Sequence, residues 1–187
     1  VRLTKNILLF TFCVELAGAI LFSFVFIKDF GLGKGIAYSI FHAISSFCNA
    51  GFDLIGLIYI TGTDNPIITL AICGLIVIGG IGYYVFWDMY ESRNFRTLTL
   101  HSKLVLIITG ILLLGGSVLM FFLEHDNPGT MGNLSMSGKI NASIFQAVNP
   151  RTAGYNSVPL ENLRMSTVAI SVVLMFIGGS PASTAGG

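Results

Sequence analysis

Charged side chains are scarce in this sequence of 187 residues. Lys, Arg, Asp and Glu together make up 10% of it, and the formal net charge is +1. An ordinary soluble domain carries about 25% charged residues. The scarcity excludes a disordered chain and a nucleic-acid-binding domain, so nucleic acid is not expected among the partners, and it argues against most soluble enzymes.

Cysteine is also scarce. Cys13, Cys48 and Cys73 stand singly in apolar surroundings, with no CxxC spacing. Neither a zinc site nor a disulfide framework is therefore indicated.

Apolar residues and glycine are abundant instead. The sequence is 53% hydrophobic, contains 22 Gly and 15 Phe, and has a mean hydropathy of +0.81. Helices that face lipid need apolar surfaces, whereas helices that pack closely need small residues. We therefore expect an all-α integral membrane protein, with the lipid bilayer as its first partner.

Three apolar stretches are long enough to cross a bilayer: residues 7–27, 66–87 and 104–123. At 1.5 Å per residue, a helix of this length covers roughly 30 Å, the thickness of the hydrocarbon core. Residues 31–63 between the first two stretches hold no full span and few charges. A half-length helix over residues 37–47 and an irregular return over 48–56 fit them better, as in a re-entrant pore loop.

The same arrangement recurs further along the chain. Residues 143–148 read SIFQAV and match SIFHAI at 39–44, and TAGY at 152–155 matches NAGF at 49–52. A second half-helix is expected over 139–148. The sequence thus predicts two tandem repeats, 1–92 and 93–187, each with a spanning helix, a pore half-helix with a filter loop, and a second spanning helix (M1–P–M2).

Basic residues indicate the orientation. The connection over residues 88–103 contains Arg93, Arg96 and Lys103, and the amino-terminus contains Arg2 and Lys5. The positive-inside rule puts both segments in the cytoplasm, so both pore loops are entered from outside.

The two four-residue motifs have the form of a potassium-channel filter, in which carbonyl oxygens replace the hydration shell of the ion. Glycine lets the backbone reach conformations that cost other residues energy, and the end of a half-helix adds partial negative charge. The alternative is that Gly51 and Gly154 are ordinary turn or packing glycines. The predicted K⁺ filter comprises Asn49, Ala50, Gly51, Phe52, Thr152, Ala153, Gly154 and Tyr155.

Three segments resemble the Trk/Ktr/HKT superfamily of potassium transporters, most closely its KtrB-type subunits: SSFCNAGFDL at 45–54, RTAGYNS at 151–157 and FIGGSPASTAGG at 176–187. The resemblance implies four M1–P–M2 units around one pore, of which these are the second and third. It also implies a bacterial cell membrane, K⁺ as the transported ion, sodium stimulation, a homodimer, and a cytoplasmic nucleotide-binding (RCK-type, KtrA-like) regulatory ring. No organic cofactor is implied.

The last segment has a physical reading of its own. A span that starts near Asn162 covers roughly 24 Å before it reaches Gly178, so it breaks inside the membrane. The resemblance implies that this loop gates the pore; the alternative is a glycine hinge between packed helices. The predicted gating loop comprises Gly178, Gly179, Ser180, Pro181, Ala182, Ser183, Thr184, Ala185, Gly186 and Gly187. Because the sequence stops inside it, we expect a piece of a longer chain.

Three polar residues near the filter motifs have open roles. We expect a structural polar contact for His42 and an acidic partner for Arg151. Asp53 either concentrates cations at the entrance or is a solvated loop charge.

Two rival functions differ from a gated pore. A secondary transporter with broken helices is one, although such half-helices normally belong to inverted repeats, whereas these copies run parallel. An intramembrane protease that uses Ser180 or Ser183 is the other, but no histidine is expected at the depth of the loop. We therefore expect no enzymatic activity.

Overall fold

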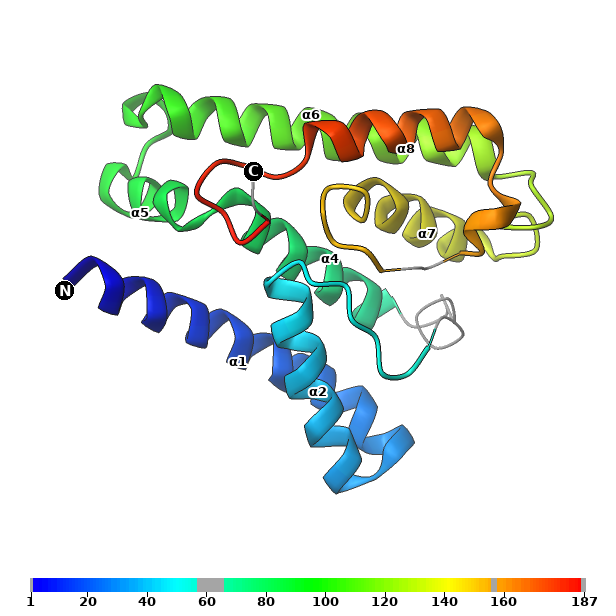
Figure 1. Cartoon of the computed structure of the whole chain (residues 1–187), viewed down its shortest axis with the longest axis horizontal. Helices are drawn as coiled ribbons and strands as arrows, with labels where there is room; N and C mark the ends of the chain where they lie inside the picture. The colour runs from blue at the N-terminus through cyan, green and yellow to red at the C-terminus, as the bar shows by residue number, and fades with distance from the viewer. Residues whose placement is uncertain (1, 57–65, 156–157, 186–187) are drawn as a thin grey trace.

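The chain is helical throughout its described part. The computed structural model describes residues 2–56, 66–155 and 158–185, and within these ranges there is no β-strand. Figure 1 shows the helices lying side by side and crossing, with α4 running through the middle of the molecule. The prediction of an all-α fold is confirmed.

The first repeat starts with a helical hairpin. The long helix α1 (Arg2–Phe30) turns at Gly31 into α2 (Leu32–Phe47), and the two helices pack along much of the length of α2. The predicted half-helix over 37–47 was too short at its start, since α2 begins at Leu32. An irregular segment follows from Cys48 to Gly56, as expected.

The expected single span over residues 66–87 was wrong. The chain forms α4 (Pro66–Ile81) and α5 (Tyr83–Ser92), which meet at an angle of 84°. Gly82 at the break has φ +89°, a left-handed value that ends an α-helix and that side chains disfavour. The break leaves the last carbonyl groups of α4 without partners inside the helix.

The second half of the chain has the same order of a long helix, a half-helix and a further helix, but these helices differ in length from those of the first half. After the short turn η1 (Phe95–Thr97) come α6 (Leu100–Glu124) and the half-helix α7 (Met136–Val148), which begins three residues before the predicted start at 139. The short turn η2 (Leu160–Asn162) leads to α8 (Met165–Ile177), which begins slightly later than Asn162 and ends at Gly178. The predicted break of this helix at Gly178 is confirmed.

Among the described residues, two helices are long and apolar enough to cross a membrane, namely α1 over Leu3–Phe30 and α6. The bent pair of α4 and α5 has the length and composition of a broken span or of a re-entrant loop, and α8 is a shorter apolar helix. Large apolar side chains project from these helices, for example Phe24 (65% exposed), Leu114 (73%) and Phe176 (92%). Such surfaces are stable against lipid or further protein.

The core lies where α4 packs against both half-helices. Buried side chains from both repeats form one cluster, including Phe22, Phe26, Ile72, Phe145 and Tyr155. Helix α4 contacts α1 and α2 of its own repeat and α7 of the other. Helix α4 is therefore the element that connects the amino-terminal helices to α7.

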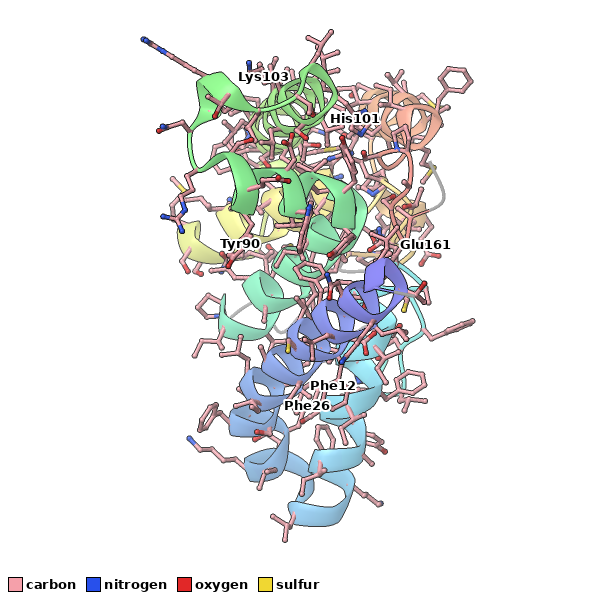
Figure 2. The ribbon with its side chains drawn as sticks, turned by 90° about the vertical axis from the view of Figure 1, so that its left-hand side faces the viewer. Phe12, Phe26, Tyr90, His101, Lys103 and Glu161 are labelled. Carbon is pink, nitrogen blue, oxygen red and sulfur yellow. The ribbon has the colours of Figure 1, made fainter. Side chains whose placement is uncertain are left out.

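Both predicted cytoplasmic segments lie at one end of the molecule. Figure 1 places the amino-terminus and the connection from α5 to α6 on the same side, on the left. In Figure 2, His101 and Lys103 lie on the green segment at the start of α6, away from the α1–α2 pair that bears Phe12 and Phe26.

Helix α4 offers a test of this packing. A Cβ at Gly79 would lie 2.1 Å from the Phe47 carbonyl oxygen, whereas a Cβ at Gly74 on the same helix would meet nothing within 4 Å. We expect Gly79→Ala to destabilise the folded protein by about 1–3 kcal/mol, because backbone must shift. Thermal unfolding of the purified full-length transporter measures this, with Gly74→Ala as the matched control; an equal midpoint for both variants would contradict the packing.

Candidate functional site

The two predicted filter motifs share positive φ angles at matching positions. Asn49 and Gly51 have φ values of +51° and +70°, and the corresponding Thr152 and Gly154 have +78° and +81°. Positive φ is unusual for residues with side chains, such as Asn49 and Thr152, and persists where the surroundings enforce it. The sequence repeat is therefore also a repeat of an uncommon backbone shape.

The two motifs lie against each other. A Cβ built at Gly51 would be 2.1 Å from the Ala153 carbonyl oxygen and 2.9 Å from the Gly154 Cα. The Asn49 amide group approaches the Thr152 hydroxyl to 3.4 Å. The structure thus brings together the two predicted filter segments, with no room for a side chain at Gly51.

Equivalent side chains tie each motif to its own half-helix. The Ser45 hydroxyl donates to the Phe52 carbonyl (2.9 Å), and the Asn149 amide donates to the Tyr155 carbonyl. Ser45 and Asn149 occupy matching positions in the two repeats, 104 residues apart. The last residue of each motif is thus held in place by a hydrogen bond from the end of the helix before it.

A buried hydrogen bond joins the repeats. The hydroxyl groups of Ser46 on α2 and Tyr155 in the second motif are 3.0 Å apart, and the two residues are 0% and 1% exposed. Because both hydroxyl groups are buried, water does not compete for this hydrogen bond. Removing one hydroxyl would leave the other without this partner and would lower the stability of the fold.

His42 makes the structural polar contact that the sequence predicted, and Asp53 is its partner. The His42 Nε2 lies 3.1 Å from Asp53 Oδ1, which also accepts a hydrogen bond from the Ile55 N–H. Burial alone raises the pKa of the Asp53 carboxyl, but the hydrogen bonds from His42 and from the Ile55 and Gly56 backbone outweigh it and lower the pKa below its ordinary value. Asp53 is therefore a fixed carboxylate and not a freely solvated charge.

The predicted gating loop folds back onto the α4–α5 break. The backbone N–H groups of Ser180 and Thr184 donate to the carbonyls of Gly80 (3.0 Å) and Gly79 (3.2 Å). Figure 1 shows this red segment beside the junction of α4 and α5. Of the predicted loop, Gly186 and Gly187 lie outside the described residues.

Thr184 also reaches the base of the first filter motif. Its hydroxyl donates to the Phe47 carbonyl at 2.8 Å, at the carboxyl end of α2. That end carries partial negative charge, where a cation would be favoured. The loop thus contacts the end of α2, which precedes the first motif in the sequence.

The partner of Arg151 is not the acidic residue that was expected. Its Nε donates to the Gly178 carbonyl (3.1 Å), and its Nη2 lies 3.4 Å from the Thr109 hydroxyl on α6. Gly178 follows the end of α8, where unpaired carbonyls concentrate partial negative charge. A helix end, and not a carboxylate, therefore receives the guanidinium.

Sequence reasoning missed two of these connections and one buried charge. Thr184 and the Ser46–Tyr155 pair were not identified as contacts, although hydroxyl groups in apolar segments are a signal for such bonds. Glu124, at the end of α6, is 0% exposed and accepts hydrogen bonds from Asn127, Thr130, Thr167 and the Arg164 N–H. These hydrogen bonds tie the end of α6 to the start of α8.

The described residues contain no group of three or more His, Cys, Asp or Glu side chains that could hold a metal ion. Oxygen atoms near the two motifs come from backbone carbonyls, from hydroxyl and amide groups and, directly after the first motif, from the Asp53 carboxylate. Such an oxygen set suits weakly held monovalent cations that shed their water.

Comparison with known proteins adds an independent observation. The family model described as TrkH, cation transport protein, matches residues 1–187. The chain is 42% identical over 189 residues to the Ktr system potassium uptake protein B of Bacillus subtilis and 38% over 188 residues to that of Vibrio alginolyticus. It is 39% identical over 187 residues to the potassium/sodium uptake protein NtpJ of Enterococcus hirae.

All of the chain is covered in these three comparisons, but only 42%, 41% and 41% of the relatives. The chain spans about two-fifths of the length of the curated relatives it matches.

Tyr155→Phe tests the bond between the repeats. The variant leaves the Ser46 hydroxyl buried without this partner, so we expect a loss of about 1–3 kcal/mol in the free energy of unfolding. Tyr90→Phe is the matched control, because Tyr90 is 75% exposed. Thermal or denaturant unfolding of the full-length protein compares the two, and equal stability would argue against the bond.

Proposed function

Because the chain belongs to the TrkH family of cation transport proteins, we propose that it forms part of the pore of a potassium uptake system. The relatives at 38–42% identity are named for potassium uptake or potassium/sodium uptake. K⁺ is the proposed substrate ion, and Na⁺ is the proposed activating or accompanying ion.

The filter is proposed at residues 49–52 and 152–155. The observation that carries this proposal is the pairing of two strained segments with positive φ at matching positions, in contact at Gly51. Alternating backbone conformations turn successive peptide groups, so that several carbonyls can face one side of the chain. An ion that passes alongside the paired segments would exchange water for carbonyl oxygens.

The half-helices favour a cation at the same place. Helix α2 ends at Phe47, with only Cys48 before the first filter segment, and α7 ends at Val148, with residues 149–151 before the second. Their carboxyl ends bear partial negative charges that are strongest where water is excluded. Each repeat would thus supply both ligands and a favourable field.

Residues 178–187 are proposed as the gate. In support, Thr184 donates to the carbonyl at the end of α2, and the backbone of the loop binds the broken end of α4. Arg151, next to the second filter segment, holds the Gly178 carbonyl. The loop would obstruct the path below the filter until these bonds break.

The remaining assignments follow from the family resemblance and stay proposals. They are a division into repeats 1–92 and 93–187, a bacterial cell membrane, a homodimer, and a cytoplasmic RCK-type ring. The amino-terminus and residues 88–103 would be cytoplasmic, with both pore loops entered from outside. The amino-terminus and the connection from α5 to α6 lie at the same end of the molecule in Figure 1, which supports this orientation.

The filter proposal predicts a loss of selectivity on substitution. Gly51→Ser and Gly154→Ser in the full-length transporter should each lower the K⁺ over Na⁺ preference by about tenfold or more, because a Cβ disfavours positive φ and, at Gly51, meets backbone. Uptake of both ions into cells that lack other potassium uptake systems measures the preference.

The matched control for these variants is Gly33→Ser on α2, where a Cβ would meet nothing within 4 Å. It should leave selectivity unchanged. Unaltered selectivity in both filter variants would reject the filter.

The gate proposal predicts a gain of flux. Thr184→Val removes the bond to Phe47, so it should raise uptake in the absence of cytoplasmic partners by about fivefold, since one hydrogen bond contributes about 1 kcal/mol. Ser183→Ala is the matched control, because the Ser183 hydroxyl bonds only to the Ala185 N–H among the interactions described. Flux that stays at the control level in Thr184→Val would count against the gate.

A further inference from the structure

We propose that His42 and Asp53 form a clamp that positions the first filter segment and thereby helps to determine which cation it accepts. This inference rests on the proposed filter function and assigns two positioning residues to it. Neither side chain belongs to the filter motif itself.

His42 is held rigidly inside the protein. It is 1% exposed, and its ring lies edge-on to the rings of Phe26 and Phe41, with centroid separations of 5.5 and 5.6 Å. Its Nδ1 lies 2.8 Å from the Tyr38 carbonyl oxygen, one helical turn earlier. The ring therefore has one orientation, which points Nε2 at Asp53.

Both ring nitrogens face oxygen acceptors, the Tyr38 carbonyl and the Asp53 carboxylate. The Asp53 carboxyl, whose pKa is lowered, is the charged member of the pair. A hydrogen bond to an ionised carboxylate is stronger than one between two neutral groups.

The clamp acts on the residues directly after Gly51. Asp53 Oδ1 accepts from His42 and from the Ile55 N–H, while the Phe52 carbonyl accepts from Ser45. Residues 52 and 53 are therefore fixed to α2 at two points, one turn of helix apart. The backbone of the filter segment cannot widen toward this side without breaking one of these bonds.

A residue of the second repeat also interacts with Asp53. Tyr155 from the second repeat has an electrostatic interaction with Asp53, and its hydroxyl is bound to Ser46. The first filter segment, the clamp and the second filter segment are thereby one connected unit.

The second repeat has different chemistry at the same positions. The sequence has Gln146 at the position of His42 and Asn156, which lies outside the described residues, at the position of Asp53. Gln and Asn side chains have both donors and acceptors and carry no charge. The two repeats thus differ in sequence by the carboxylate next to the proposed filter.

That difference supplies the test. In the full-length transporter, His42→Gln removes the ring that binds the Asp53 carboxylate, and Asp53→Asn removes the carboxylate that binds the His42 ring. We expect each to lower the K⁺ over Na⁺ preference by about three- to tenfold and to raise the KM for K⁺ more than it lowers the maximal rate. The double variant has the residue pair of the second repeat, and we expect its preference to return to within about twofold of the parent.

His125→Gln is the matched control. His125 forms a second His–Asp pair, with Asp126 at 2.9 Å, whose side chains are 38% and 71% exposed. It should leave the preference and the KM unchanged.

Thermal unfolding of each purified variant shows whether it folds. Asp53→Glu, which keeps the carboxylate but displaces it by one carbon, replaces any single variant that does not fold and should lower the preference in the same way. Unchanged preference in the folded variants would overturn the clamp, and so would a double variant no better than the single ones.

The result is separable from that of the filter itself. If Gly51→Ser alters the preference and the clamp variants do not, the clamp is wrong and the filter remains. If Gly51→Ser also has no effect, the proposed filter fails and the clamp fails with it.

Discussion

The need of buried backbone groups for hydrogen-bond partners governs this structure. Inside a membrane, a helix that stops exposes carbonyl groups that lipid cannot bind. The chain stops helices at four interior points, after Phe47, Ile81, Val148 and Ile177. Each end is bound by other parts of the chain or lies beside a segment proposed to bind ions.

The helix ends are satisfied by segments that lie elsewhere in the chain, and for α4 and α2 these segments belong to the other half of the sequence. The end of α4 binds the backbone of the last loop, the end of α2 binds Thr184, and the end of α8 binds Arg151. Each bond joins segments that are far apart in the sequence. Filter, broken helix and loop consequently depend on one another, and a change in any of them is felt by the rest.

Much of the plan could be predicted from the sequence. Apolar length predicted α1 and α6, and the duplicated motifs predicted two half-helices followed by irregular segments, which the structure contains. The end of α8 at Gly178 was predicted because Gly and Pro disfavour helix. These features are local, so composition and spacing are enough to find them.

The sequence-based predictions were wrong where contacts between distant segments determine the structure. Residues 66–87 are as apolar as a straight span, and the bend at Gly82 depends on the loop that receives the freed carbonyls. Gly79, Gly80 and Gly82 were the signal, but glycine in a membrane helix more often marks close packing. Arg151 was given an acidic partner because pairing by charge is the simpler rule, and a helix end as counterion is not visible in sequence.

The attachment of the loop has an energetic consequence. Two backbone bonds and one hydroxyl bond hold residues 180–184 to α4 and α2, and at about 1 kcal/mol each they favour the docked state by about 3 kcal/mol. That corresponds to a docked population only about a hundredfold larger than the undocked one. In the gate proposed above, a regulatory partner would have to bind the undocked arrangement about ten-thousandfold more tightly to reverse that ratio, so the proposed gate would be a reversible two-state element and not a permanent barrier.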